Sequence, residues 1–143
     1  MIVLIDTDVL LDVALDRPPY AAAAVELLNA CQVGHLSGFV AWHSISNFYY
    51  LVRPTKGGLE TRSMVLDLLQ FIRVAATDTE SLLYAIGLEM NDFEDAMQVA
   101  AAVACNAEVI VTRNHRDYTD SPITVSGPQA LTSELDLRLP PST

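Results

Sequence analysis

Basic residues are scarce in this 143-residue sequence. It holds 8 lysines and arginines against 18 aspartates and glutamates, which gives a net charge of −10, and Lys56 is its single lysine. Proteins that bind nucleic acid through a broad positive surface need many cationic side chains to contact phosphates. The composition excludes such a surface. It leaves open a small site where bound cations neutralise clustered carboxylates, or a partner with a basic surface.

Cysteines, long apolar runs and glycine-rich phosphate loops are also few or missing. Cys31 and Cys105 lie in apolar helical patterns, which favours buried free thiols in a reducing compartment. No apolar run reaches the roughly 18 residues of a membrane span, and the first residues lack the basic segment of a secretory signal. We therefore expect a cytoplasmic protein without membrane contact. No Gly-x-Gly-x-x-Gly or Walker loop implies a nucleotide cofactor, and the three histidines lack zinc-ligand spacing.

Apolar residues, in contrast, are abundant. They make up 51% of the chain, whereas charged residues make up 18%. This balance excludes disorder, and the length suffices for one sizeable core. Because no linker or internal repeat divides the sequence, we expect a single domain over residues 1–143, with a loose proline-containing tail after about residue 139.

Short apolar runs alternate with helical patterns along the sequence. Strands are expected at residues 2–5, 35–40, 71–75, 108–112 and 123–125, and helices at 8–16, 20–33, 41–53, 60–70, 78–90, 91–105 and from 127 onward. A loop is expected at 54–58, where proline and two glycines cluster. Strands separated by helices indicate parallel pairing through right-handed crossovers. The predicted fold class is α/β, with a parallel sheet of four or five strands flanked by helices.

An aspartate directly follows the first expected strand. Residues 1–5 read Met-Ile-Val-Leu-Ile, and Asp6 stands where this strand passes into a helical pattern. Open α/β sheets bind their ligands just beyond the carboxyl ends of the strands. Asp6 is therefore a candidate metal ligand or catalytic carboxylate. Asp8 fits the N-cap of the following helix, and Asp12, four residues before Asp16, fits a solvated helix face.

Two further segments place acids in comparable settings. Asp92 and Asp95 open the helix at 91–105, either as capping residues or as two carboxylates that share one helical face. Asp117 follows the strand at 108–112. Carboxylates from three segments at one sheet edge are the oxygen ligands that Mg²⁺ or Mn²⁺ prefers. A metal held in this way can activate water for attack on a phosphodiester.

Three motifs resemble those of PIN-domain proteins, and among these the VapC-type toxin ribonucleases. Residues 4–12 resemble the family's D-T-N-V-L-L-D, residues 92–101 its D-x-x-D-A-x-x-A-A, and residues 111–118 its V-T-x-N-x-x-D-F, all in the family's order. The resemblance implies a three-layer PIN-like fold and a Mg²⁺- or Mn²⁺-dependent endoribonuclease that acts on RNA. It also implies the toxin of a toxin–antitoxin pair, with an antitoxin partner and a homodimeric state.

The same resemblance assigns roles by position. The family's metal-binding acids correspond to Asp6, Asp95 and Asp117, with Asp92 beside them as a fourth catalytic acid, and Thr112 and Asn114 support the site. Arg113 and Arg116, together with Arg53 and Lys56, are the candidate contacts to RNA phosphates. Asn47 occupies the position where the family usually carries a glutamate, and it is expected to support the site. Its amide oxygen can bind a metal but carries no charge, so metal affinity should fall.

Two other functions fit parts of the sequence. A PIN-like module that has lost catalysis and acts through a protein partner is compatible with Asn47 and the net charge of −10. A phosphatase of haloacid-dehalogenase type is suggested by Asp6-Thr-Asp8, which resembles that family's D-x-D, although Leu10 stands where it has threonine or valine. Metal titration tests the first alternative. Phosphatase activity on a small phosphoester, with none on RNA, would favour the second.

Overall fold

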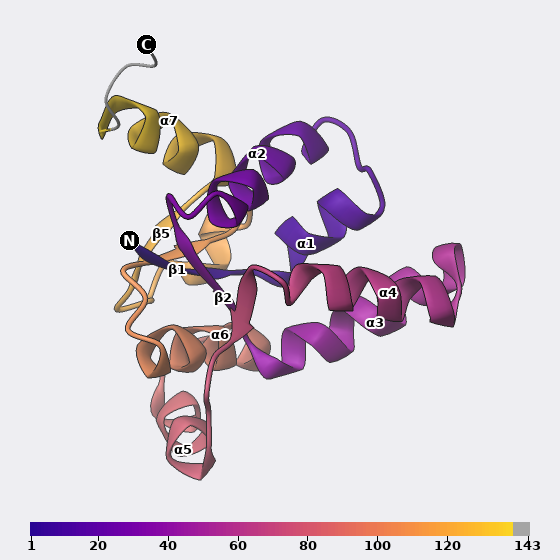
Figure 1. The fold of residues 1–143 in the computed structure, drawn as a ribbon. Coiled ribbons are helices and arrows are strands. Elements are labelled where there is room, and N and C mark those ends of the chain that lie inside the picture. Colours follow the sequence, from indigo (N-terminus) through magenta and orange to yellow (C-terminus); the bar gives the residue numbers. More distant parts are fainter. Residues whose placement is uncertain (139–143) are drawn as a thin grey trace.

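A five-stranded parallel sheet forms the centre of the protein in a computed structural model, which describes residues 1–138 (Figure 1). Its strands are β1 (Ile2–Ile5), β2 (Ser37–Val40), β3 (Ile72–Val74), β4 (Val109–Val111) and β5 (Thr124–Ser126). They lie in the order β3-β2-β1-β4-β5, and every neighbouring pair is parallel. The predicted α/β fold is confirmed. The tail expected to be loose after about residue 139 lies outside the described residues.

Helices cover both faces of this sheet. They are α1 (Thr7–Ala14), α2 (Ala21–Gln32), α3 (Trp42–Lys56), α4 (Gly58–Leu68), α5 (Thr79–Gly87), α6 (Phe93–Ala104) and α7 (Pro128–Arg138), with a short 3-10 helix, η1 (His115–Tyr118), after β4. Figure 1 shows α1, α2 and α7 on one side of the sheet and α5 and α6 on the other. Within residues 1–138, no helix has both the length and the apolar character needed to cross a membrane.

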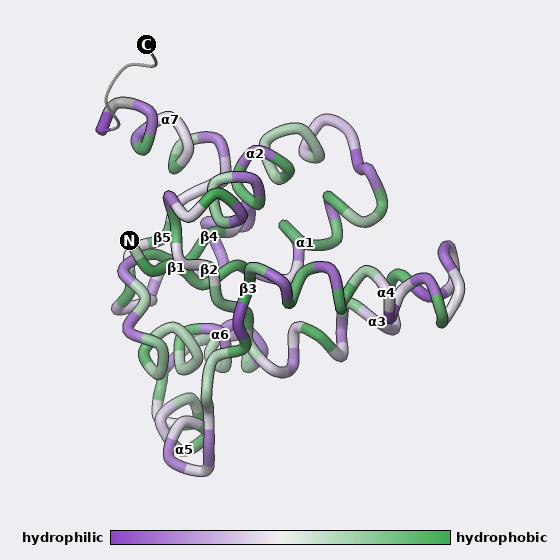
Figure 2. The backbone as a smooth tube through the Cα atoms, in the orientation of Figure 1, coloured by the Kyte–Doolittle hydropathy of each residue, from purple (hydrophilic) through white to green (hydrophobic). Residues whose placement is uncertain are grey.

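Strand β1 lies in the middle of the sheet and is buried on both faces. Val3 and Ile5 pack into a cluster with Leu27 of α2, whereas Leu4 points to the opposite face and packs with Val99 of α6. Successive side chains of a strand alternate between faces, so burial on both sides requires an unbroken apolar run. This explains why the strand was visible in the sequence. In Figure 2 the central strands are largely hydrophobic, and the connection from α1 to α2 is hydrophilic.

Helices α3 and α4 pack side by side and meet at a tight turn (Figure 1). The loop expected at 54–58 is wrong, because α3 continues to Lys56 and α4 begins at Gly58. Pro54 lies in the last turn of α3 and does not end the helix. Gly57 alone makes the turn with a φ of 83°, a conformation that residues with a side chain rarely adopt.

The strand order creates a switch point between β1 and β4. From β1 the chain runs to β2 and β3 on one side, and it later forms β4 and β5 on the other. The connections that leave β1 and β4 therefore diverge, which opens a crevice at the carboxyl edge where α/β sheets bind ligands. Asp6 follows β1 directly and donates its backbone N–H to the Val111 carbonyl at 2.9 Å. The two strand ends that carry candidate acids are thus adjacent.

Candidate functional site

Asp6 is held in place by three neighbouring groups. It is the N-cap of α1, and its Oδ1 accepts hydrogen bonds from the Thr7 backbone N–H at 2.7 Å and from Gln98 Nε2 at 3.3 Å. Its Oδ2 accepts a hydrogen bond from the Tyr118 hydroxyl at 3.0 Å. The residue is only 6% exposed, and this burial raises the pKa of its carboxyl. The expected N-cap, Asp8, is instead the second residue of α1.

A buried network of neutral polar side chains lies against Asp6. Gln98 of α6 donates to the Ser44 hydroxyl at 2.7 Å, and the Thr7 hydroxyl donates to the same Ser44 oxygen at 2.9 Å. These three side chains come from α6, α3 and α1, so the network ties three helices to the carboxylate. Sequence reasoning missed Gln98, Ser44 and Tyr118. Gln98 and Ser44 are single polar residues inside helical patterns and have no distinctive spacing, whereas Tyr118 was visible as the last position of the motif at 111–118.

Carboxylates from three segments line one pocket of about 480 Å³. The acids that line it are Asp6, Asp8, Asp92, Glu94, Asp95 and Asp117, and Asn47 and Asn114 also face it. None of the lining residues is basic. All four catalytic acids expected from the sequence, together with Asn47 and Asn114, therefore share one pocket. Thr112, Arg113 and Arg116 do not line it.

Burial and mutual repulsion raise the pKa values of several of these acids. The pKa of Asp95 rises to about 7, first through burial and then through the charges of Asp92, Asp6 and Asp117. The pKa of Asp8 rises to about 6, through burial and the charge of Asp6. Burial, followed by the charges of Asp6 and Asp92, also raises the pKa of Glu94. An unbalanced group of carboxylates of this kind favours a bound cation.

The donor atoms suit a hard divalent cation. The pocket offers carboxylate and amide oxygens and no thiol or imidazole, which matches Mg²⁺ or Mn²⁺ rather than zinc. Within residues 1–138, no three histidine, cysteine, aspartate or glutamate side chains already stand close enough to hold one ion. The carboxylates surround the same space but remain apart, as like charges do. The residues fit the ion by donor type and charge, and side-chain movement would have to bring them together.

The N-terminus of α6 combines capping with a place at the pocket. Asp92 is the N-cap, and its Oδ1 accepts hydrogen bonds from the backbone N–H groups of Glu94 at 2.8 Å and Asp95 at 3.3 Å. Asp92 therefore both caps α6 and lines the pocket, so capping and a place in the acidic group are compatible. Glu94 was not among the expected residues, because the motif treats its position as variable. Its Oε1 accepts a hydrogen bond from Asn47 Nδ2 at 3.0 Å.

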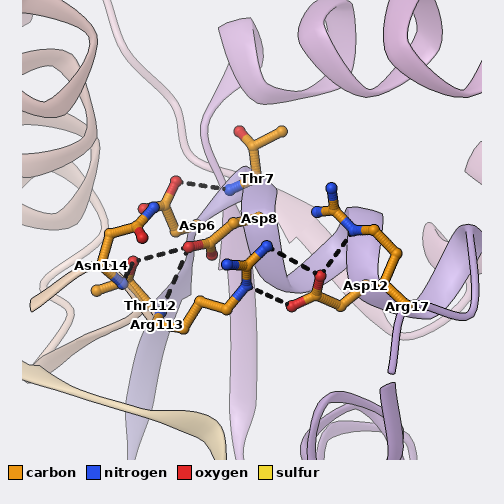
Figure 3. A network of polar contacts seen from close by, with 8 residues as sticks. All are labelled: Asp6, Thr7, Asp8, Asp12, Arg17, Thr112, Arg113 and Asn114. Carbon is orange, nitrogen blue, oxygen red and sulfur yellow. Dashed lines mark hydrogen bonds and ion pairs between the residues drawn. The ribbon is translucent and has the colours of Figure 1, made fainter. Parts of the chain in front are cut away.

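Asp8 connects α1 to the loop after β4 (Figure 3). Its Oδ2 accepts hydrogen bonds from the Thr112 hydroxyl at 3.2 Å and from the Arg113 backbone N–H at 3.4 Å. The Thr112 hydroxyl in turn accepts a hydrogen bond from the Asn114 backbone N–H at 3.1 Å. Asp8 and Thr112 thus set the path of the segment that leads to Asn114 and Asp117.

Asp12 lies in an ion-pair cluster, and the solvated helix face expected for it is wrong (Figure 3). Arg113 Nε lies 2.8 Å from Asp12 Oδ2, and Arg17 Nε lies 2.9 Å from Oδ1. The Arg113 guanidinium also stacks on the Tyr20 ring, 4.1 Å from its centre. Arg113 therefore anchors the loop after β4 to α1. Arg116 instead lines a small adjoining pocket together with Asp92 and Asp117.

Comparisons with known proteins place these features in context. A family model described as PIN domain matches residues 2–116. No curated protein matches the chain. Similar solved structures include VapBC2 from Rickettsia felis bound to a promoter DNA fragment (TM-score 0.70, 15% identity, 89% of this chain and 98% of that chain covered). Others are VapBC-1 from nontypeable Haemophilus influenzae (0.64, 13%, 90% and 98%) and Mycobacterium tuberculosis VapC20, a sarcin–ricin loop cleaving toxin (0.60, 12%, 76% and 86%). At these identities the likeness shows a shared fold.

Proposed function

The chain belongs to the PIN-domain family, and we propose that it is a metal-dependent endoribonuclease that hydrolyses RNA phosphodiesters. The observation that carries this proposal is the pocket at the β1–β4 switch point, where carboxylates gather from three segments without a basic side chain among the lining residues. When bound, Mg²⁺ or Mn²⁺ supplies water of lowered pKa and positive charge opposite a phosphodiester.

Asp6, Asp95 and Asp117 are the residues that we propose to hold the metal. Asp6 is already oriented by Thr7 and Tyr118, so its carboxylate needs little reorganisation. Asp95 lies in the first turn of α6, where the helix dipole stabilises a negative charge near an ion. Asp117 comes from η1, and the hydrogen bonds of Thr112 set the path of the loop that leads to it. The three proposed ligands thus come from the N-cap of α1, the first turn of α6 and η1.

Asp92 and Asn114 complete the proposed site. The Oδ1 atom of Asp92 caps α6, which leaves Oδ2 for the pocket. Asn114 faces the same pocket and offers amide groups that can bind a phosphate oxygen or an ion. We propose that Asp92 joins the catalytic acids and that Asn114 positions the substrate.

RNA phosphates would meet the few basic side chains beside this pocket. Arg116 shares its adjoining pocket with Asp92 and Asp117, and the Arg53 guanidinium lies 5.7 Å from the centre of the Tyr50 ring, which lines the main pocket. We propose these two arginines as phosphate contacts. The Nε and one terminal nitrogen of the Arg113 guanidinium donate hydrogen bonds to Asp12, so we assign Arg113 to anchoring the loop after β4.

We further propose that the protein is the toxin of a toxin–antitoxin pair and forms a homodimer. Support comes from the shared fold with the toxin–antitoxin complexes VapBC2 and VapBC-1. The net charge of −10 favours an antitoxin segment with basic side chains. Exposed Trp42 and Tyr50 are side chains of the kind enriched at protein interfaces. Co-purification with the product of a neighbouring reading frame tests the antitoxin, and light scattering tests the dimer.

Cleavage of RNA with Mn²⁺, Mg²⁺ or EDTA tests the enzymatic proposal. We expect cleavage with either metal, loss of cleavage in EDTA, and loss of both cleavage and Mn²⁺ binding in Asp6→Asn. A wild-type protein that binds no Mn²⁺ at millimolar concentration would exclude the nuclease and leave the non-catalytic binding module. No structural observation favours the haloacid-dehalogenase-type phosphatase, and hydrolysis of a small phosphoester would be needed to revive it.

A further inference from the structure

An uncharged residue stands at one expected acidic position of this site. Asn47 on α3 faces the pocket that contains Asp6, Asp95 and Asp117. The acid beside it comes from another helix, because Asn47 Nδ2 donates a hydrogen bond to Glu94 Oε1 of α6 at 3.0 Å. We propose that Glu94, held by Asn47, supplies the further carboxylate of the metal site. This inference rests on the proposed metal-dependent function.

The geometry gives the two side chains complementary tasks. The Asn47 amide binds Oε1 of Glu94, so Oε2 of the same carboxylate can face an ion. Both residues line the pocket and are 47 positions apart in the sequence, so the contact depends on the fold bringing α3 and the first turn of α6 to the same pocket. An amide N–H that binds a carboxylate orients it without neutralising it, which is how supporting groups hold metal ligands in place.

Charge explains why asparagine and glutamate suit each other here. A glutamate at position 47 would bring a second negative charge beside Glu94, and the two would repel each other. With Asn47, the pair carries one negative charge and one good hydrogen bond. A site with an acid on α3 and a neutral residue on α6 would carry the same single negative charge as Asn47 and Glu94 do. The pair therefore carries the same charge whichever of the two helices bears the acid.

Glu94 must be distinguished from an acid that merely stabilises a helix end. The chain contains a matched control in Glu80, which is the second residue of α5 and follows the N-cap Asp78, as Glu94 is the second residue of α6 and follows the N-cap Asp92. Glu80 does not line the pocket. A change from glutamate to glutamine at either position removes the same interaction with a helix dipole, but only Glu94→Gln alters the proposed metal site.

Mn²⁺ binding measured by isothermal titration calorimetry tests this proposal, because the readout does not depend on RNA cleavage. We expect Glu94→Gln to weaken binding by about tenfold, as loss of a group at a metal site commonly does. Glu80→Gln should bind within about twofold of wild type, a change under 0.5 kcal/mol. The double variant Asn47→Glu with Glu94→Gln returns the carboxylate to α3 and should bind Mn²⁺ more tightly than Glu94→Gln alone. Circular dichroism confirms that each variant is folded.

The possible failures can be told apart. If Asp6→Asn loses Mn²⁺ binding but Glu94→Gln binds as wild type does, the role of Glu94 is refuted and the proposed function stands. Equal weakening by Glu94→Gln and Glu80→Gln would assign the effect to helix ends and would also refute it. A wild-type protein without Mn²⁺ binding would refute the proposed function and, with it, the role of Glu94.

Discussion

The ion-pair cluster at Asp12 offers a quantitative test of how the site loop is held. The Asp12 side chain is 2% exposed and accepts three hydrogen bonds, at 2.8 and 3.2 Å from Arg113 and at 2.9 Å from Arg17. In Asp12→Asn, the negative charge and one acceptor oxygen are lost while the shape is kept. The loop after β4 should then lose its main attachment to α1, and the free energy of unfolding should fall.

The size of this loss in unfolding free energy depends on how buried Asp12 and its two arginine partners are. A hydrogen bond to a charged group contributes about 1.5–3 kcal/mol, so three such bonds give an upper limit of about 4.5–9 kcal/mol. The Arg17 and Arg113 side chains are 37% and 28% exposed, so water compensates much of the lost contact. Asparagine also keeps one acceptor. We therefore expect a loss of about 2–3 kcal/mol in the free energy of unfolding.

Urea unfolding followed by circular dichroism measures this loss, and Asp16→Asn is the matched control. Asp16 is exposed near the end of the same helix with a φ of 48°, which asparagine tolerates, so its change should stay within about 0.5 kcal/mol. In a double-mutant cycle with Arg113→Met, the coupling energy should exceed about 1 kcal/mol. A loss at Asp12 no larger than at Asp16, or strict additivity with Arg113→Met, would refute the reasoning.

Three further predictions concern the core and the acidic pocket. Phe48→Ala removes a side chain that is 1% exposed and should lower the free energy of unfolding in urea by about 3–5 kcal/mol. Tyr50→Ala, at a residue 62% exposed, should lower it far less. Equal losses would contradict the burial of Phe48 in the core. Tyr118→Phe removes the hydrogen bond to Asp6 and should weaken Mn²⁺ binding by about tenfold in calorimetry, and unchanged binding would show that the hydroxyl does not orient the carboxylate. Folding raises the pKa of Asp95 from its ordinary value of 3.8 to about 7. Between these two pH values the folded state binds more protons than the unfolded state. The stability of the metal-free protein should therefore fall as pH rises from about 4 to 7. Asp95→Asn should make the decline in melting temperature between pH 4.5 and 7.5 smaller, and an unchanged decline would contradict the shift.

Most of the fold could be predicted because its signals are local. The strands β1 and β4 are continuous apolar runs because both of their faces are buried, whereas β2, β3 and β5 are short segments in which apolar residues stand beside polar ones. The turn between α3 and α4 was harder. Proline and paired glycines usually indicate a loop, but Pro54 is accommodated within the last helical turn and Gly57 needs no further residues to reverse the chain.

The candidate site could be predicted only where a motif named its residues. The aspartates at positions 6, 92, 95 and 117 were visible as acids after strands or at a helix start. Asp12 was misinterpreted because its partner Arg113 lies 101 residues further along the chain. Glu94 and Gln98 could be recognised only from their partners, because Glu94 accepts a hydrogen bond from Asn47 and Gln98 donates one to Ser44. Contacts of this kind arise only when helices from distant parts of the sequence pack together.

The position of β4 beside β1 also governs when the pocket can form during synthesis. The ribosome makes β1, β2 and β3 early, but β1 receives its second neighbour only after β4 emerges, and Asp117 comes later still. Before β4 emerges, a nascent chain therefore carries Asp6 at an unpaired strand edge, with the acids of α6 already made and Asp117 of η1 still missing. The protein therefore acquires its full set of pocket carboxylates only after Asp117 has been made. The pocket is consequently incomplete in any nascent chain that stops short of residue 117.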